Sequence, residues 1–402
     1  MKLLFVSNGP TEDAIGAKIA ASLSHPTWAL PLVGRGRAYE GVAQEILGPR
    51  KEMPSGGFLF GSLRNTLSDL KAGFLSMSLA QWRAALSSQP EAVVVVGDAY
   101  ALSVGALAAR GRPLYHVNPL VSAHYLEGAR PLELLLDWGG SDFTPYERFL
   151  HRKARAVFVR DEPSLKRLRN LGIAHAYWYG SFAMDLLPPP EQDITRWVGE
   201  GDLLALLPGT RGDEAFSLPL MLEAALHLPL TPAVAWAKGW DALPTLPGWQ
   251  GQEAGPGVLR LEKEGKAAWV LRGAFSAILH RSRLALATAG TATEQAAGLG
   301  IPVVAFPTPG PQYTRAFAKR QKRLLGEALH LAEPDPKHVA ERALVLFREE
   351  GLYRKASQAG RERIGPPGGI LGVARHIQED LHRLERVRGL TQVATYPLDL
   401  KK

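Results

Sequence analysis

Short apolar runs alternate with longer amphipathic segments along most of this 402-residue chain, and that alternation restricts the fold more than any other feature. The runs are rich in aliphatic and β-branched residues, which favour strands, and the segments between them suit helices of about ten residues or more. Such an alternation predicts parallel sheets of the doubly wound type. The predicted strands are 3–7, 92–96, 113–117, 156–160, 203–207, 233–237, 258–261, 284–287 and 302–306.

The length of the chain suits two domains better than one core. A polar segment with three consecutive prolines, 186–201, interrupts the alternation and marks the boundary. We therefore predict an α/β protein with two Rossmann-like doubly wound domains that face a cleft. The predicted ranges are 1–187 for the first domain, 188–200 for a linker, 201–369 for the second domain, and 370–402 for a C-terminal helix and tail that could pack back on the first domain.

Composition and charge narrow the classes of partner. Lys and Arg number 47 against 39 Asp and Glu, and this net charge of +8 favours anionic partners. No RNA-binding signature, zinc-finger spacing or basic stretch with interleaved aromatic residues occurs, so we expect no nucleic acid partner. The absence of cysteine excludes disulfides, thiol nucleophiles and cysteine metal sites, and it fits a reducing cytoplasm.

The sequence also bears on membranes. The N-terminus has too short an apolar run for a signal peptide, and no window approaches the roughly 20 apolar residues that span a bilayer. We therefore expect a cytoplasmic protein whose contact with the inner membrane surface is at most peripheral. Residues 60–86 contain one apolar helical face, which either contacts a membrane or acyl chain or packs on a sheet as an ordinary amphipathic helix. Its residues are Phe60, Leu63, Leu67, Leu70, Phe74 and Met77, with Trp82 nearby.

Residues 284–314 predict an anion site. An apolar strand is followed by a turn of small residues and by a helix that begins near Thr291, so the first backbone N–H groups of the helix point toward a ligand above the strand. The turn consists of Gly290, Thr291, Ala292 and Thr293. Glu294 lies in the first helical turn, where it could accept hydrogen bonds from a ribose or simply complement the helix dipole. Gln312 follows the next strand.

A second turn of the same kind follows strand 203–207. Gly209 permits close backbone approach, Thr210 follows it, and the planar guanidinium of Arg211 suits a phosphate. The alternative is a surface loop with a solvated arginine. Two phosphate-facing turns in one domain predict a nucleotide diphosphate site more strongly than either turn alone.

The first strand of the chain ends in an acidic turn. Asn8 and Gly9 are followed by Glu12 and Asp13, whose negative charges are unsuited to a phosphate, so we expect this turn on the acceptor side. The alternative is that the two carboxylates only complement the dipole of the following helix.

Asp98 follows the buried strand 92–96 at the edge where doubly wound enzymes place their working groups. Its carboxylate could take a proton from an attacking hydroxyl, or it could cap the helix that begins at Tyr100. His116 and Asn118 end the next strand. Either His116 or the following His124 could serve as a base, although a single histidine is more often a structural group.

Taken in order, these motifs resemble the lipid-A-disaccharide synthase family and, more widely, the two-Rossmann glycosyltransferases that include the undecaprenyl-muramoyl-pentapeptide N-acetylglucosaminyltransferases. The resemblance covers nearly the whole chain and depends on the order of motifs that are weak alone. The first turn departs from the family, since it reads Ser-Asn-Gly-Pro-Thr-Glu-Asp where the synthases carry Ser-Gly-Glu-x-Ser-Gly-Asp. The matching segments are 12–17, 97–99, 115–119, 180–185, 207–211 and 290–294.

The resemblance implies a GT-B type enzyme that transfers a sugar from a UDP-sugar to a lipid-linked acceptor with inversion, without metal or other cofactor, in the synthesis of lipid A or a related glycolipid. It implies Asp98 as the leading base, with Glu12 and Asp13 as further catalytic candidates. The donor residues are Gly209, Thr210, Arg211, Gly290, Thr291, Ala292, Thr293, Glu294 and Gln312, and the acceptor residues are Asn8, Gly9, His116 and Asn118.

Two other functions fit the same sequence. One is a nucleotide-sugar epimerase or hydrolase with the same paired domains, and the other is a non-catalytic protein that binds a nucleotide sugar. The donor sugar, the acceptor and the oligomeric state are not encoded in any motif that we recognise.

Overall fold

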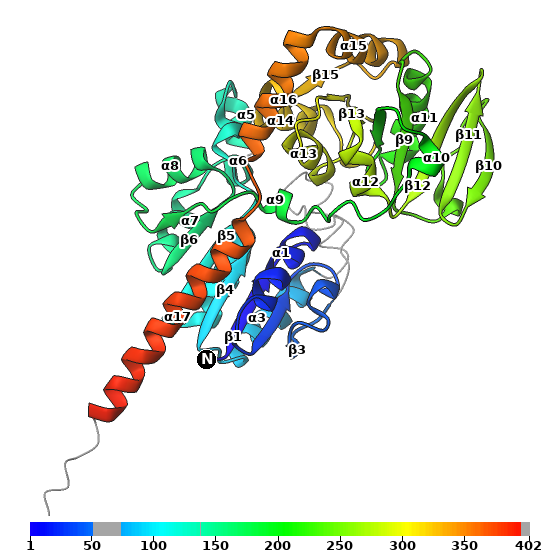
Figure 1. Ribbon diagram of the computed structural model, residues 1–402. Coiled ribbons are helices and arrows are strands. Elements are labelled where there is room, and N and C mark those ends of the chain that lie inside the picture. The colour runs from blue at the N-terminus through cyan, green and yellow to red at the C-terminus, as the bar shows by residue number, and fades with distance from the viewer. Residues whose placement is uncertain (51–73, 137, 395–402) are drawn as a thin grey trace, which may run out of the picture. The chain divides into compact units, whose positions relative to one another are not determined.

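A computed structural model describes residues 1–50, 74–136 and 138–394 of the chain (Figure 1). The chain forms two compact α/β units. The first unit comprises Met1–Ala123, Pro131–Phe182 and Gly368–Lys402, and the second comprises His124–Arg130 and Ala183–Pro367. The segment 188–200, predicted as a linker, therefore belongs to the second unit, and its Ile194 and Val198 are buried in that unit's core.

The first unit is built on a parallel sheet with the strand order β3-β2-β1-β4-β5-β6-β7. The strand order reverses at β1, which lies between β2 and β4, and this switch point is where doubly wound folds bind ligands. The strands are β1 (Leu3–Ser7), β2 (Thr27–Pro31), β3 (Glu45–Ile46), β4 (Ala92–Val96), β5 (Leu114–Asn118), β6 (Ala156–Val159) and β7 (Ala176–Tyr177).

Helices cover both faces of this sheet. Ala85 of α3, Leu102 of α4 and Leu150 of α7 share one buried cluster with Val93 and Val95 of β4, so these three helices lie on the same face. The helices of the unit are α1 (Pro10–Ala21), α3 (Phe74–Ser87), α4 (Ala99–Ala109), α5 (Pro131–Leu136), α6 (Trp138–Ser141), α7 (Pro145–His151), α8 (Glu162–Asn170) and α17 (Gly369–Ala394).

The last helix, α17, packs on the first unit although it is the last element in sequence (Figure 1). Its Asp380 accepts hydrogen bonds from Arg155, at 2.5 Å from Nε and 2.7 Å from Nη2, and from the hydroxyl of Tyr115 on β5 at 2.7 Å. These bonds hold the helix against the sheet.

The second unit contains a sheet with the strand order β10-β11-β12-β9-β8-β13-β14-β15. The strands from β12 to β15 in this order are parallel, whereas β10, β11 and β12 pair antiparallel. The strands are β8 (Leu203–Leu207), β9 (Thr231–Trp236), β10 (Gln250–Gly255), β11 (Val258–Lys263), β12 (Lys266–Arg272), β13 (Ser282–Ala287), β14 (Val303–Ala305) and β15 (Leu329–Leu331). The helices of this unit include α10 (Thr195–Val198), α11 (Glu214–Ala225), α12 (Phe275–His280), α13 (Thr291–Gly298), α14 (Arg315–Leu325), α15 (Pro336–Arg348) and α16 (Glu350–Ile364), and the short α9 (Phe182–Asp185) joins the two units.

The parallel parts of the two sheets, with their helices, confirm the predicted fold class of two Rossmann-like domains. The predicted strand 258–261 is present within β11, but it belongs to an antiparallel hairpin, so its place in the parallel alternation was wrong. The hairpin turn, Glu264 and Gly265, has positive φ at both residues, as a two-residue turn of this type requires.

The predicted apolar face over 60–86 is described only in part. Phe60, Leu63, Leu67 and Leu70 lie outside the described residues. Helix α3 is described from Phe74 onward, and its Met77 is buried. Among the described helices, none is long and apolar enough to cross a bilayer.

Candidate functional site

The predicted donor residues follow two adjacent strands of the second unit. Strand β8 lies between β9 and β13, so the strand order reverses beside it and the ends of β8 and β13 form a switch point. The turn after β8 carries Gly209 and Arg211, and the turn after β13 carries Gly290. The hydroxyl of Thr288 donates to the carbonyl of Pro208 at 3.2 Å, which joins the two turns.

Gly209 has a backbone conformation that the turn requires. Its φ is +83°, a value that L side chains rarely adopt, and an added methyl group would lie 3.1 Å from the carbonyl oxygen of Thr288. Thr210 and Arg211 follow it and are exposed. The turn therefore presents its backbone and the Arg211 side chain at the carboxyl edge of the sheet.

The amino end of helix α13 suits an anion. Gly290 is its N-cap and provides no side-chain cap, so the first N–H groups, at Thr291 and Ala292, point out of the helix without a capping oxygen from that residue. Thr293 is buried and its hydroxyl donates to the carbonyl of Ala289 at 2.7 Å. Glu294 is half-buried in the first turn.

A residue that the sequence did not single out, Gln321 of α14, supports this turn. Its side-chain amide donates to the carbonyl of Ala289 at 3.1 Å and to that of Gly290 at 3.3 Å. Its oxygen accepts a bond of 2.5 Å from the hydroxyl of Tyr313. All three side-chain bonds are buried or partly buried, and they fix the turn that would face the ligand.

Asp213 brings the segment with Gln312 to the same site. Its carboxylate accepts bonds from the hydroxyl of Thr308 at 2.5 Å and from the backbone N–H groups of Gln312 and Tyr313 at 3.1 and 3.0 Å. A methyl group on Gly290 would lie 3.5 Å from Nε2 of Gln312, so the Gln312 side chain lies beside the anion-binding turn. The sequence motifs did not identify this function of Asp213.

We predict that Asp213→Ala lowers the free energy of unfolding of the second unit by about 3 kcal/mol, because three buried or partly buried donors lose their acceptor. Chemical denaturation measures this change. Thr308→Val removes one of the three donors and also the acceptor of the Gly310 N–H at 3.0 Å, so it should cost less, about 2 kcal/mol. Equal costs for the two variants would show that Asp213 does not hold the loop.

A cation also lies near these turns. Lys238 follows β9 and pairs with Glu214, whose other carboxylate oxygen accepts the N–H of Gly212 at 2.8 Å. Burial alone would raise the pKa of Glu214, but its bonds with Lys238 and the backbone lower the pKa overall. The carboxylate is therefore held ionised and fixes the end of the β8 turn.

In the first unit, the switch point lies between β1 and β4, where Ser7 pairs with Val96 in register. Asp98 caps helix α4, since its Oδ1 accepts the N–H groups of Tyr100 at 2.9 Å and Ala101 at 3.0 Å. A methyl group on Gly97 would lie 2.0 Å from Oδ1 of Asn8, so the ends of the two strands are in close contact.

Asp98 thus has the capping role that was one of the two sequence-based alternatives, and its geometry leaves the second role open. Burial raises the pKa of Asp98, and the bonds that it accepts from Ala101, Tyr100 and Asn8 offset part of this rise. Both cap bonds go to Oδ1, and a carboxylate with a raised pKa is a better proton acceptor once it is ionised.

The acidic turn after β1 is more buried than a simple helix start. Glu12 and Asp13 are 8% and 3% exposed. Oδ1 of Asp13 accepts a 2.5 Å bond from Ser7, whose hydroxyl lies 2.8 Å from that of Tyr39. The pKa of Asp13 is raised to about 7, mainly by burial. The bond from Ser7 lowers this pKa, and the negative charge of Glu12 raises it further. A group with such a pKa is suited to proton transfer near neutral pH.

Asn8 and Gly9 precede this turn. Gly9 is buried, and a methyl group there would lie 2.2 Å from a carboxylate oxygen of Glu12, so the Glu12 side chain folds back onto this turn. Asn8 is half-buried, lies against Gly97 and bonds to the Asp98 side chain. The structure therefore brings Asn8, Gly9 and Asp98 together at one edge of the sheet.

His116 and Asn118, predicted as acceptor contacts, are buried and bonded within the protein. Nε2 of His116 lies 2.9 Å from the carbonyl of Gly97 and must donate to it, which leaves Nδ1 to accept from Nε2 of His151 at 2.9 Å. Oδ1 of Asn118 accepts two backbone N–H groups, and Nδ2 donates to Glu147 at 2.7 Å. Both residues thus position the strand ends instead of presenting open polar groups.

His116, Glu147 and His151 are also the buried residues whose side chains suit a metal ion, since their ligating atoms lie within 4.8 Å of one another. The hydrogen bond between the two neutral imidazoles already accounts for their facing nitrogens. Burial lowers the pKa of His116 to about 4 and raises the pKa of Glu147 to about 8, so the cluster is uncharged at neutral pH.

We predict that Glu147→Gln makes the melting temperature less sensitive to pH. The folded protein holds a proton on Glu147 up to a pKa of about 8, whereas the ordinary value is 4.5, so wild-type stability falls as the pH rises through this window. Glutamine keeps the bond from Asn118 but has no proton to lose. Thermal melts from about pH 5 to about pH 8 should show a loss of several degrees in the wild type and a smaller loss in the variant. Parallel curves would contradict the buried protonated carboxyl.

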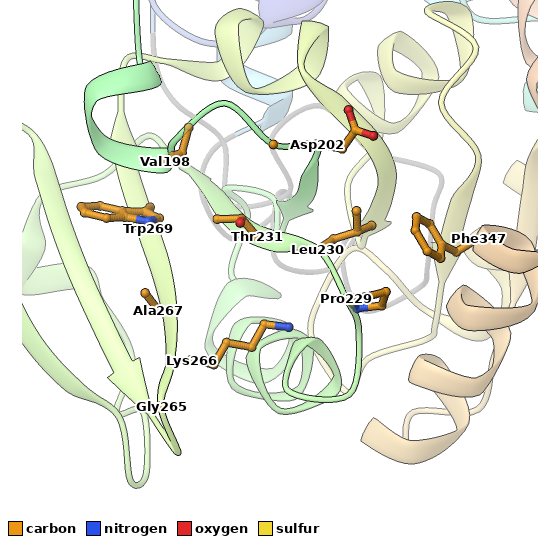
Figure 2. Close-up of a pocket in the computed structure, with 11 residues that line it drawn as sticks. Val198, Asp202, Pro229, Leu230, Thr231, Gly265, Lys266, Ala267, Trp269 and Phe347 are labelled. Atoms are coloured by element: carbon orange, nitrogen blue, oxygen red, sulfur yellow. The ribbon is translucent and has the colours of Figure 1, made fainter.

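A cavity of about 660 Å³ lies elsewhere in the second unit (Figure 2). Asp202 directly before β8, Thr231 at the start of β9 and Lys266 at the start of β12 line it, so it opens at the amino edge of the sheet, away from the donor turns. Nζ of Lys266 donates to the carbonyls of Ala225 and Leu228 and is thus engaged at the end of α11. None of the predicted site residues lines this cavity.

No protein-family model matches the sequence, and no curated protein matches it. Solved structures do match. S. aureus MnaA, solved with UDP, matches with a TM-score of 0.59 and 14% identity over 95% of this chain and 97% of that chain. The calicheamicin glycosyltransferase CalG4 matches with a TM-score of 0.64 and 16% identity over 95% of this chain and 98% of that chain. A UDP-GlcNAc 2-epimerase from Neisseria meningitidis, bound to UDP-GlcNAc, matches with a TM-score of 0.53 and 15% identity over 95% of this chain and 100% of that chain.

At these identities the similarities establish the fold, which is the GT-B type that the resemblance implied. Glycosyltransferases and 2-epimerases both occur among the matching structures, so the comparisons show the fold and do not single out the lipid-A-disaccharide synthases.

Proposed function

We propose that this protein is a glycosyltransferase that transfers a sugar from a UDP-sugar to a lipid-linked acceptor. The observation that carries the proposal is the pair of turns at the switch point of the second unit, where Gly209, Arg211 and the uncapped start of α13 lie together. An anion bound there meets backbone N–H groups, a helix dipole and a guanidinium.

In this proposal the second unit holds the donor. Arg211 and the N–H groups of the Gly290–Thr293 turn stabilise the departing diphosphate, Glu294 accepts hydrogen bonds from the ribose, and Gln312 contacts the sugar. Arg211 and these N–H groups supply positive charge where negative charge develops in the transition state, which is the main requirement of such a transfer. We therefore propose that neither a metal ion nor an organic cofactor is needed.

The first unit then supplies the base. A hydroxyl of the acceptor loses its proton to Asp98 as it attacks the anomeric carbon, the bond to the diphosphate breaks, and the configuration at that carbon inverts. Asp13 and Glu12 are the further candidates, and the pKa of about 7 at Asp13 favours it over a carboxylate of ordinary pKa. Asn8 and Gly9 lie beside Asp98 and are proposed to contact the acceptor.

The class of the acceptor follows from the motif resemblance. We propose a lipid-linked sugar of lipid A or of a related glycolipid, reached at the cytoplasmic face of a membrane. The departures in the first turn favour an acceptor other than the lipid A precursor itself.

A nucleotide-sugar 2-epimerase is the second candidate, because solved structures of such proteins also match this fold. Incubation with a UDP-sugar alone separates the two candidates. Rapid donor conversion without any acceptor supports the epimerase or a hydrolase, whereas conversion that depends on an added glycolipid supports the transferase.

The first experiment is a thermal-shift screen of UDP and UDP-sugars. A ligand that binds the folded protein raises the melting temperature with the logarithm of its concentration over its dissociation constant. We expect a shift with UDP and a larger one with the true donor. If neither UDP nor any UDP-sugar shifts the melting temperature, the donor assignment is wrong.

A further inference from the structure

Two histidines and a glutamate from distant parts of the sequence meet on the first unit. His25 lies in the loop between α1 and β2, and His382 and Glu385 lie about one helical turn apart on α17. Each side chain offers one ligating atom, and these three atoms lie within 4.8 Å of one another. Because His25 comes just before β2 begins, the cluster lies at the amino edge of the parallel sheet, opposite the edge that carries Asp98.

The loop and the helix are already bonded to each other around this cluster (Figure 1). The backbone N–H of Ser24 donates to Oε1 of Gln378 on α17 at 2.9 Å. Oε1 of Glu385 lies 3.0 Å from Nε2 of His25 and 3.2 Å from the amino group of Met1. The protein's own bonds therefore place the ligating groups before an ion binds, which lowers the cost of ordering a site.

The ring of His25 has a buried nitrogen without a partner. Its side chain is 7% exposed, and its Nδ1 makes no hydrogen bond with any described residue. Buried polar atoms normally have a partner, so this nitrogen indicates a group that the described residues do not supply. A histidine that binds a metal ion commonly uses one ring nitrogen for the ion and donates the other to a carboxylate. His25 has this arrangement, since its Nε2 already faces Glu385.

His382 provides the second imidazole and a route for the ion. Its Nε2 lies 2.6 Å from the amide nitrogen of Gln378. Because an amide nitrogen can only donate, Nε2 has a lone pair, as a metal ligand must. His382 is exposed, so an ion can reach the cluster from solvent. The cluster of His116, Glu147 and His151 differs in this respect, since each of its members is at most 1% exposed.

We propose that His25, His382 and Glu385 bind a divalent transition-metal ion, with Zn²⁺ as the preferred ion. Two imidazoles and a carboxylate, with water in the fourth position, are a known ligand set for tetrahedral Zn²⁺, whereas Mg²⁺ and Ca²⁺ prefer oxygen ligands. The ion joins α17 to the loop before β2 and so holds the last helix on the first unit. A simple ion pair between His25 and Glu385 is the alternative, but it accounts neither for Nδ1 nor for His382.

Direct metal binding tests this proposal without an activity assay. The full-length chain, purified without a histidine tag and freed of metal with EDTA, is titrated calorimetrically with ZnCl₂ at about pH 7.5, where an ordinary histidine is neutral. We expect a single Zn²⁺ per chain and a melting temperature that rises with the Zn²⁺ concentration. Mg²⁺ at the same concentrations should produce neither effect. A wild type that does not bind Zn²⁺, or that binds it without a rise in melting temperature, overturns the proposal.

Two variants test the location of the ion. His382→Gln and Glu385→Gln should each weaken Zn²⁺ binding at least about tenfold, because even the loss of a partner outside the ligand set costs roughly 10- to 100-fold in metal affinity. His227→Gln is the matched control, since His227 is an exposed histidine of the second unit, and it should bind Zn²⁺ as the wild type does. Wild-type affinity in both cluster variants indicates an adventitious ion only and overturns the proposal.

The metal-free variants are also melted, because lost binding must not reflect lost folding. His382 and Glu385 lie at the surface, so we expect both variants to melt near the temperature of the metal-free wild type. Such a folded variant with weakened Zn²⁺ binding supports the proposal. The site does not depend on the proposed function: a wild type that binds Zn²⁺ through this cluster but shows no thermal shift with UDP supports the metal site and contradicts only the donor assignment.

Discussion

Asp98→Asn is expected to lower turnover by a factor of about 10² to 10⁴ while the protein keeps its fold. The residue has two roles that this substitution separates. Asparagine is as good an N-cap as aspartate, so its Oδ1 still accepts the N–H groups of Tyr100 and Ala101. It cannot accept the proton of an attacking hydroxyl. A glycolipid-dependent transfer assay measures the first effect, and thermal melting measures the second.

Asp335→Asn is the matched control, because Asp335 caps α15 in the same way, with a bond of 2.9 Å from the N–H of His338. It should change neither turnover nor donor binding. Asp98→Ala loses the cap as well and should be less stable by about 1 kcal/mol. Full turnover of a folded Asp98→Asn protein would leave Asp98 as a cap only and direct the search for the base to Asp13.

The sequence located the strands and their ends more reliably than the partners of the site residues. The buried runs 3–7, 92–96 and 203–207 are strands with these bounds, because a strand buried on both faces is apolar throughout. Strand β12 was missed although the turn at Glu264 and Gly265 before it is a hairpin signal. Strand β2 was also missed, since its five residues include Trp28 and Pro31 and resemble the loops beside them.

Asp98 shows why the sequence left two interpretations open. In a parallel α/β fold the residue after a strand is often the residue before a helix, so the same position suits a cap and a working group. Only the geometry shows that the cap bonds occupy Oδ1. The sequence predicted the position of Asp98 but could not show which of its two carboxylate oxygens accepts the cap bonds.

Asp213, Gln321 and Lys238 could not have been found from motifs. Asp213 meets the Gln312 loop across 99 residues of sequence, and Gln321 meets the Gly290 turn across 31 residues. Asp213 lies only two residues after the predicted Arg211, but nothing in the sequence shows that it holds the Gln312 loop. Gln321 and Lys238 have no neighbour that marks them as part of a site. Such partners follow from the strand order, which brings the ends of β8, β13 and β14 side by side.

Arg211→Ala is expected to lower turnover more than a hundredfold, and the loss of this one leaving-group contact corresponds to about 3 kcal/mol in the transition state. The physical reason is that the guanidinium charge of Arg211 lies at the turn where the diphosphate is proposed to bind. Arg211 is exposed at the carboxyl edge of the second sheet, directly after the Gly209 turn that meets Thr288. Lys238, the cation beside the same turn, is paired with Glu214 and so is partly neutralised.

Because Arg211 is exposed, its replacement should leave the melting temperature nearly unchanged, and the effect should be confined to turnover and to the affinity for UDP. Arg211→Lys should recover only part of the activity, since an ammonium group cannot make the paired bonds of a guanidinium with a phosphate. Arg354→Ala is the control, because Arg354 is an exposed arginine of the same unit, 76% exposed and paired with Glu350 on α16. Near-normal turnover of folded Arg211→Ala protein would remove Arg211 from the site and would leave the amino end of α13 as the main anion-binding group.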